Sequence, residues 1–360
     1  MMPDSTRSNE VPSSRRPRPV PLAPAAASAP AFSVDVALRS DPGCVRDNNE
    51  DSLLVTSAGA SPRAVPGAIR LIIEPPAFAV LGACDGMGGA AAGEVASRMA
   101  VEIIDEVMRR DGPSASIDEL GRRVMRSLDE ATRKIYARAQ AQRVLCGMGT
   151  TATLGVLSGR TLLVAQIGDS RAYLLRRGRL TQLTRDQTLA TLMVESGQLA
   201  PEDLASFPFN NVILQAVGAT PRLDIDLRAA TVCQGDVLLL CSDGLHGPVT
   251  DAEIEAVLAR ETSPSAACEA LIARALHAGG PDNVSCIVAR IEGAGLPLPD
   301  GDEVMVERAV LEPEESPPPT DRPDAVQADA SGEERAGATP SLSPSWIERL
   351  RAALRRGSPA

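Results

Sequence analysis

The chain has 360 residues, of which 44% are hydrophobic, 23% are charged and only 2% are aromatic. Its core must therefore be aliphatic, which is adequate because burial scales with apolar area. The net charge is −11, and residues 300–335 alone hold twelve acidic residues against three arginines, a balance of −9. The remainder is only mildly acidic and carries no basic stripe, which argues against nucleic acid as a partner.

The cysteine pattern favours a reducing compartment. There are seven cysteines, an odd number, without a C-x-x-C pair, and Cys84, Cys241 and Cys286 lie in apolar runs. Buried thiols in a cytoplasmic protein are expected rather than disulfides or a zinc site. No apolar run approaches the ~20 residues needed to cross a bilayer. Residues 1–31 are a poor secretion signal and predict a disordered tail rich in Pro, Ser, Arg and Ala.

The first ordered half begins with strands and continues with helices. Strands are predicted at residues 33–38, 52–56 and 77–84, and a loop at 57–66. Apolar residues then recur at helical spacing from Val95 to Val107 and from Ile117 to Ile135. This half is therefore expected to supply one pair of amphipathic helices.

The second half returns to strands. Four are predicted at residues 150–157, 161–167, 172–176 and 180–184. The short links Ser158-Gly159-Arg160 and Arg177-Gly178 suit hairpins. A helix near 189–196 and irregular chain follow, and the remaining elements are strands at 224–229, 237–241 and 283–291 and helices at 251–260 and 264–278.

Hairpin-linked strands imply mainly antiparallel sheets, and amphipathic helix pairs must cover sheet faces. The order of elements fits an α+β fold, a four-layer α-β-β-α sandwich spanning residues 32–293, although periodicity alone does not select it uniquely. Residues 294–343 are interpreted as an acidic Pro-rich linker. Residues 344–360 are either a short basic amphipathic helix, able to dock on a membrane surface or a protein, or a frayed tail.

Acidic residues recur where predicted strands end, as in Asp85-Gly86, Asp243-Gly244 and Asp282-Asn283. Any one of them is most simply a turn, because Asp-Gly is a common turn dipeptide. If several converge, their carboxylates repel one another and need cations. Oxygen ligands without His or Cys favour Mg²⁺ or Mn²⁺ over Zn²⁺.

Six short segments occur in a fixed order along the chain. They are Arg46-Asp47-Asn48-Asn49-Glu50-Asp51-Ser52, Asp85-Gly86-Met87-Gly88-Gly89, Gly149-Thr150-Thr151, Gly168-Asp169-Ser170-Arg171, Ser242-Asp243-Gly244 and Gly280-Pro281-Asp282-Asn283-Val284-Ser285. From about Val34 to Arg290 this series resembles that of bacterial PPM (PP2C-like) metal-dependent serine/threonine protein phosphatases. The resemblance implies the sandwich fold and hydrolysis of phosphoserine and phosphothreonine in proteins, reversing a Ser/Thr kinase.

The resemblance also implies a ligand set for two metal ions. Asp85 would bridge them, Asp243 and Asp282 would complete the first site, and the Gly86 carbonyl would bind the second ion. A hydroxide shared by the two ions would attack phosphorus in line, so that no cysteine nucleophile is needed.

The remaining roles implied by the resemblance surround these ions. Glu50 and Asp51 would hold waters around the second ion, and Asp169 with Asp243 would bind a third, so two or three Mn²⁺ or Mg²⁺ ions are expected. Arg46 would bind the substrate phosphate, because a guanidinium fork suits phosphate oxygens.

The chain departs from the family pattern where relatives carry histidine. Ala90, Met87 and Gln187 stand at such positions, and the chain has just two histidines. His246 is close in sequence to Asp243, with a packing or capping role at least as plausible as one near the site. Protonation of the leaving group is assigned to a metal-bound water, which predicts a shallower acid limb in the pH–rate profile than histidine-containing relatives show.

Other functions were weighed against this interpretation. Gly86-Met87-Gly88-Gly89 matches neither common phosphate-loop pattern, so nucleotide binding is not supported. A catalytically dead scaffold is the main alternative, although every expected metal aspartate is present. Residues 186–211 match the family's variable flap, and the substrate, the choice between Mn²⁺ and Mg²⁺ and the oligomeric state are not readable from the sequence.

Overall fold

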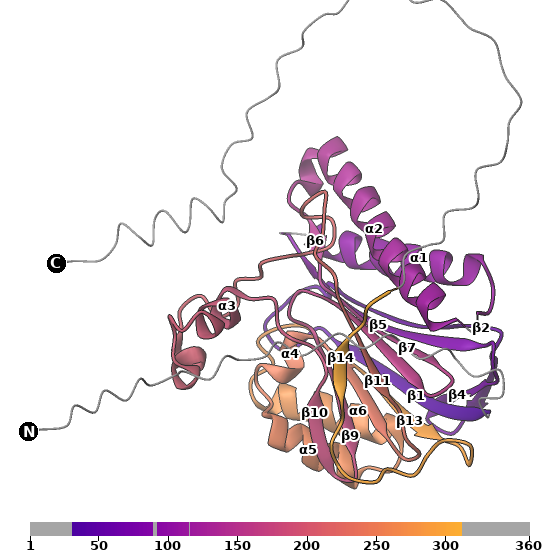
Figure 1. Ribbon diagram of the computed structural model, residues 1–360. Helices are drawn as coiled ribbons and strands as arrows, with labels where there is room; N and C mark the ends of the chain where they lie inside the picture. The colour runs from indigo at the N-terminus through magenta and orange to yellow at the C-terminus, as the bar shows by residue number, and fades with distance from the viewer. Residues whose placement is uncertain (1–30, 89–91, 115, 312–360) are drawn as a thin grey trace, which may run out of the picture. The chain divides into compact units, whose positions relative to one another are not determined.

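The computed structural model describes residues 31–88, 92–114 and 116–311. These residues form two β-sheets packed face to face, with helices on the outer side of each (Figure 1). The N-terminal tail up to residue 30, the expected C-terminal helix at 344–360 and Ala90 lie outside the described residues. Within the described ranges no helix is both long enough and apolar enough to cross a membrane.

The first sheet joins the two ends of the described domain. Its strand order is β10-β9-β12-β13-β1-β4-β3, with bounds Arg179–Gln182, Arg171–Arg176, Val237–Cys241, Val284–Glu292, Phe32–Asp41, Ala68–Ile73 and Ser61–Val65. The first and last long strands, β1 and β13, pair antiparallel from Ser33↔Glu292 to Asp41↔Val284. The helices of this layer are α4, α5 and α6, which span Asp243–His246, Asp251–Arg260 and Pro264–His277.

The second sheet has the order β14-β11-β8-β7-β5-β2, with bounds Val306–Arg308, Asp226–Thr231, Thr161–Ile167, Ala152–Ser158, Phe78–Met87 and Asp51–Ala58. A two-residue strand, β6 (Gly149–Thr150), also pairs with β5. Its helix pair, α1 (Ala92–Arg110) and α2 (Ile117–Ala141), packs together on the opposite side of the molecule from α5 and α6 (Figure 1). The expected four-layer sandwich is therefore confirmed.

Aliphatic side chains fill the three interfaces between the layers. Leu81 and Leu238 are fully buried between the sheets. Leu128 is fully buried under the first helix pair, and Leu271 is fully buried under the second. Burial of such side chains contributes roughly 1.5–3 kcal/mol each, so the scarcity of aromatic residues does not prevent a large core.

The expected hairpin after β9 shows how local sequence sets geometry. Arg177 has φ 50° and Gly178 has φ 87°. Positive φ at both central residues is what a two-residue turn of type I′ requires, because its twist matches that of the flanking strands. The hairpin places Arg179 opposite Arg176, and β9 and β10 pair as predicted.

Two boundaries differ from expectation. Part of the loop expected at 57–66 is strand β3, which forms a hairpin with β4. Its solvent-facing edge position tolerates Pro62, which hides the strand pattern. The fold also continues past residue 293, because Leu296 is buried and Ala309 N donates to Leu227 O at 2.9 Å beside β14. The domain end expected at 293 is thus too early.

Candidate active site

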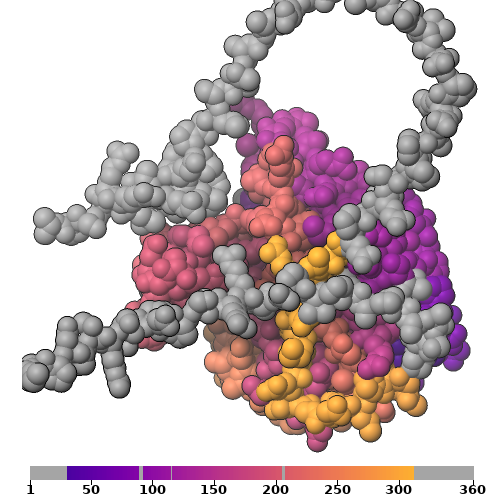
Figure 2. All heavy atoms as spheres, viewed as in Figure 1, coloured from indigo at the N-terminus to yellow at the C-terminus, as the bar shows by residue number. Residues whose placement is uncertain are grey.

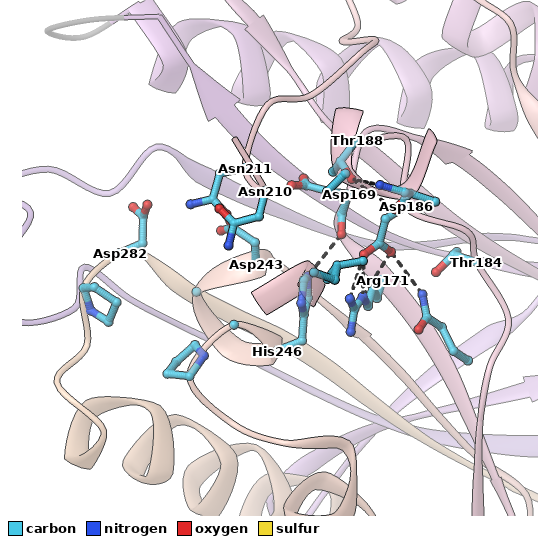
Figure 3. A pocket seen from close by; sticks show the side chains of 18 of the residues that line it. Asp169, Arg171, Thr184, Asp186, Thr188, Asn210, Asn211, Asp243, His246 and Asp282 are labelled. Carbon is cyan, nitrogen blue, oxygen red and sulfur yellow. Dashed lines mark hydrogen bonds and ion pairs between the residues drawn. The ribbon is translucent and has the colours of Figure 1, made fainter. Parts of the chain in front are cut away.

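The expected aspartates meet at one end of the sandwich. Asp51 opens β2 and lies opposite Asp85 on β5 in the strand register. Asp243 begins α4 directly after β12, and Asp282 precedes β13. Asp169 follows β8, and Figure 3 shows it on the same cavity as Asp243 and Asp282. Carboxylates from both sheets thus gather where their strands end.

Burial and mutual repulsion disfavour the ionised form of these carboxylates. Burial, and then the charge of Asp51, raises the pKa of Asp85 well above its usual range. Burial is likewise the main cause that raises the pKa of Asp51 to about 7 and that of Asp169 to about 8. The pKa of Asp243 is also raised, by burial and then by Asp282. In the described structure Arg46 and Arg171 offset only part of this negative charge, and the pKa values stay raised.

Three buried carboxylate oxygens confirm the shortage of partners. Within this cluster, Oδ1 of Asp51, Asp169 and Asp243 accepts no hydrogen bond from the described residues. A buried acceptor without a donor costs about 1–3 kcal/mol, and more when it is charged. Hard, unpartnered oxygens are the donors that Mg²⁺ and Mn²⁺ take, so the set fits divalent cations.

Gly86 and Glu50 form a second part of the donor set. A Cβ atom on Gly93 would lie 2.5 Å from Glu50 Oε2 and 2.7 Å from Gly86 O. The carboxylate and the carbonyl therefore approach one another across a space that only glycine leaves open. No three His, Cys, Asp or Glu side chains of the described residues stand close enough to hold an ion as they are, so binding of an ion would require these side chains to move closer together.

Arg46 lies at the rim of the same cavity, on the loop between β1 and β2. Its Nη2 donates to Asp282 Oδ2 at 2.7 Å, and its side chain is 55% exposed. The hydrogen bond to Asp282 raises the pKa of Arg46 further. An exposed guanidinium beside a carboxylate cluster is placed to meet an anion that enters from solvent.

Hydroxyl side chains form hydrogen bonds to the aspartate cluster and its backbone. The sequence analysis predicts no such role for them. Ser242 Oγ donates to Asp51 Oδ2 at 2.8 Å. Thr151 Oγ1 accepts from Asp85 N at 2.9 Å and pairs with Ser170 Oγ at 2.7 Å. The only available signal was their position beside the motif aspartates.

His246 lies near the site, but it is not poised to exchange a proton at neutral pH. Burial, and then the charge of Arg171, lowers its pKa to about 4. Its Nε2 is 3.1 Å from Asp169 O, a pure acceptor, so the neutral ring must donate there. His246 therefore holds the backbone at Asp169.

Gln187 supports the same turn at a position where the sequence comparison expected a histidine. Its Oε1 accepts from Gly168 N at 2.9 Å. Its backbone N–H donates to Gly168 O at 2.9 Å, and its backbone carbonyl accepts from Leu214 N at 2.8 Å. Gln187 thus links the turn before Asp169 to the two chain segments that flank residues 188–213. Met87 is the last residue of β5.

The cavity itself has a volume of about 1000 Å³. One part is lined by Arg46, Asp169, Asp243 and Asp282, and another by the segment containing α3 (Leu189–Glu195). In Figure 3, Asn210 and Asn211 of this segment face Asp243. In Figure 1 the segment projects to the left of the sandwich, and Figure 2 shows it projecting at the same edge of the molecule.

Known proteins share this architecture and sequence. A family model described as protein phosphatase 2C matches residues 71–278. The serine/threonine protein phosphatase PstP of Mycobacterium tuberculosis is 40% identical over 261 residues, which cover 71% of this chain and 44% of the relative. The chain thus spans less than half of that relative's length. The serine/threonine phosphatase stp of Listeria innocua is 30% identical over 250 residues, 69% of this chain and 93% of the relative.

Solved structures agree with the sequence relatives. The catalytic domain of PstP in complex with two manganese ions superposes with a TM-score of 0.60 at 34% identity, covering 73% of this chain and all of that one. The phosphatase Stp1 from Staphylococcus aureus gives a TM-score of 0.63 at 29% identity, covering 72% and 95%. The chain belongs to the protein phosphatase 2C family, the metal-dependent serine/threonine phosphatases.

Proposed function

We propose that this chain removes phosphate from phosphoserine and phosphothreonine in proteins, by metal-dependent hydrolysis at the Asp85–Asp243 cluster. The observation that carries the proposal is the group of buried, unpartnered carboxylate oxygens, two of which belong to Asp169 and Asp243 and so to the cavity that also presents Arg46. Such a group is unfavourable unless cations neutralise it. The cavity volume of about 1000 Å³ is at the upper end of the range usual for ligand sites.

The proposed ligand roles follow from the positions of the oxygen donors. Asp85, Asp243 and Asp282 would hold one ion, while Asp85 and the Gly86 carbonyl would hold the second. Divalent cations at such a site lower the pKa of water and offset charge on phosphoryl oxygens. Mn²⁺ and Mg²⁺ are both proposed, because oxygen donors serve either.

Further carboxylates extend the proposed donor set. Glu50 and Asp51 would orient water around the second ion, and burial raises the pKa of Glu50, as expected for a carboxylate that gains from a nearby cation. Asp169 would take part in a third site with Asp243. Its unpartnered Oδ1 supports that role.

Arg46 would bind the phosphoryl group. Its guanidinium is exposed on the cavity side, and a planar fork with several N–H donors matches phosphate oxygens. Charge stabilisation of this kind is the main contribution of a protein to phosphoryl transfer. His246 would not protonate the leaving group, because it is neutral and donates to Asp169 O.

Phosphorylated proteins are the proposed substrates, and a Ser/Thr kinase or its targets are the proposed opposing partners. A cytoplasmic setting is proposed because all seven cysteines are free and disulfides are rare there. Docking through residues 344–360, on a membrane surface or a protein, stays a prediction from the sequence.

The test is hydrolysis of p-nitrophenyl phosphate and of a phosphothreonine peptide with Mn²⁺, with excess EDTA, and for Asp243→Asn. The matched control is Asp129→Asn, the same change at an exposed position on α2. Turnover that requires Mn²⁺, fails in Asp243→Asn and persists in Asp129→Asn is expected. Absence of turnover on both substrates would favour a scaffold role instead.

A further inference from the structure

The loop that carries Arg46 lies directly against the segment that carries Asp282. Cys44 N donates to Gly280 O at 2.8 Å. Gly43 has φ +80°, and a Cβ atom there would lie 2.2 Å from Asp282 O. Any side chain at this position would push the two backbones apart. The loop that carries Arg46 and the segment that carries Asp282 are therefore in direct backbone contact.

Asn283 joins these two segments through its side chain. Its Oδ1 accepts from Glu50 N at 2.8 Å. Its Nδ2 donates to Pro42 O at 2.9 Å and to Asn48 O at 2.8 Å. Since an N–H must meet an oxygen and a carbonyl must meet an N–H, these partners set the orientation of the amide.

The geometry of these bonds closes the loop at both ends. Pro42 and Glu50 flank the loop between β1 and β2, and one buried amide, 6% exposed, holds both. Arg46 lies midway between them and reaches Asp282, the neighbour of Asn283. A side chain that fixes both ends of a short loop limits where the guanidinium at its centre can lie.

We propose that Asn283 is a positioning residue for Arg46, holding the loop at 42–50 so that the guanidinium meets a phosphate above the Asp282 segment. The inference rests on the proposed phosphatase function. It differs from a purely structural role, because it ties the effect of Asn283 to the presence of Arg46.

A double-variant cycle separates the two roles. Binding of inorganic phosphate to the full chain in Mn²⁺ would be measured by calorimetry, with KM and kcat for p-nitrophenyl phosphate, for Asn283→Ala, Arg46→Ala and the double variant. Each single variant is expected to weaken phosphate binding about tenfold, since one charge-assisted contact is worth that much. The double variant is expected to bind no more weakly than Arg46→Ala, because coupled residues are not additive.

Two results would overturn the positioning role. One is unchanged phosphate affinity in Asn283→Ala with only a lowered melting temperature. The other is an equal loss with and without Arg46, which would mean that Asn283 acts on another part of the site. The stability control is Arg123→Ala, which removes part-buried hydrogen bonds to the carbonyl of Gly112, before α2, and to Glu119 on α2. It should lower the melting temperature and leave phosphate affinity unchanged.

A second variant keeps the test decisive if Asn283→Ala does not fold. Asn283→Asp keeps the volume and the acceptor for Glu50 N but loses both donors. Repulsion of phosphate by its added charge would persist in an Arg46→Ala background, whereas a positioning effect would disappear. If the unaltered protein neither binds phosphate nor hydrolyses either substrate, the proposed function and this inference both fail. If the unaltered protein turns over normally but the effects of the Asn283 and Arg46 substitutions on phosphate affinity are additive, only this inference fails.

Discussion

Asp236 and Asp243 lie at opposite ends of the same strand, β12; Asp236 is buried, and Asp243 has a buried Oδ1. Asp236 is held by Arg176, whose Nε and Nη2 donate to it at 3.0 and 2.7 Å, and by Cys233 N at 2.8 Å. Asp243 has an unpartnered Oδ1 and a raised pKa. A buried carboxylate that the protein satisfies supports the fold, whereas one that it leaves unsatisfied awaits a ligand.

The same substitution at the two ends of β12 should therefore have opposite consequences. Asp243→Asn is expected to lower kcat on the order of 10²–10³-fold, because it removes a donor to the ions that stabilise transition-state charge. Its metal-free stability should equal or exceed that of the unaltered chain, since one repelling charge is gone. Steady-state kinetics and urea unfolding in EDTA check both. Near-normal turnover would mean that Asp243 is only structural.

Asp236→Asn is expected to destabilise the fold by about 3–5 kcal/mol, because it leaves the charge of buried Arg176 unpaired. The Arg176 side chain is 8% exposed and also donates to Glu303 O and Thr231 O. Turnover per folded molecule should stay unchanged. Urea unfolding with activity measured well below the transition tests this, and a loss of kcat without a loss of stability would contradict the comparison.

The pH dependence of the metal-free protein gives a third test. Asp51 and Asp169 have pKa values raised to about 7 and about 8. A carboxyl whose pKa is raised on folding stabilises the fold fully below its unfolded pKa, ~4, and loses that contribution as pH rises through the folded value. In EDTA, the melting temperature should therefore fall between pH 5 and pH 8, by about 5 °C or more.

Mn²⁺ should remove most of that fall, because the ions compensate the same charges. Combining Asp51→Asn with Asp169→Asn should flatten the metal-free profile. A melting temperature in EDTA that rises over this pH range would show that the aspartates are not strained.

His246→Ala should have the smallest effect. Because the pKa of His246 is lowered to about 4, the ring stays neutral over the working range and supplies no titration near 6.5. The acid limb of the pH–rate profile should keep its position, with kcat reduced less than about tenfold by a looser Asp169 turn. An acid limb near pH 6.5 that disappears in this variant would make His246 a general acid.

Local sequence patterns predicted much of the fold. The helices α1 and α2 lie where apolar residues recur at helical spacing, and the turn at Arg177-Gly178 is the predicted hairpin. The β3–β4 hairpin was not predicted because its outer strand, β3, lies at the sheet edge and shows no alternation. The stretch from Leu296 to β14 was not predicted because its composition is that of a linker. Both depend on a neighbouring strand being present, which local patterns do not report.

By itself, the sequence determined which residues are candidates for the site, because the order of motifs from Arg46 to Asp282 limits the family and hence the chemistry. Only the tertiary structure decided how they act together. β1 pairs with β13 across about 250 residues of sequence, which brings Asn283 to both ends of the Arg46 loop. Burial then leaves Asp51, Asp169 and Asp243 short of partners while Arg176 satisfies Asp236. Desolvation and unpaired charge are properties of packing, and they arise only when distant segments meet.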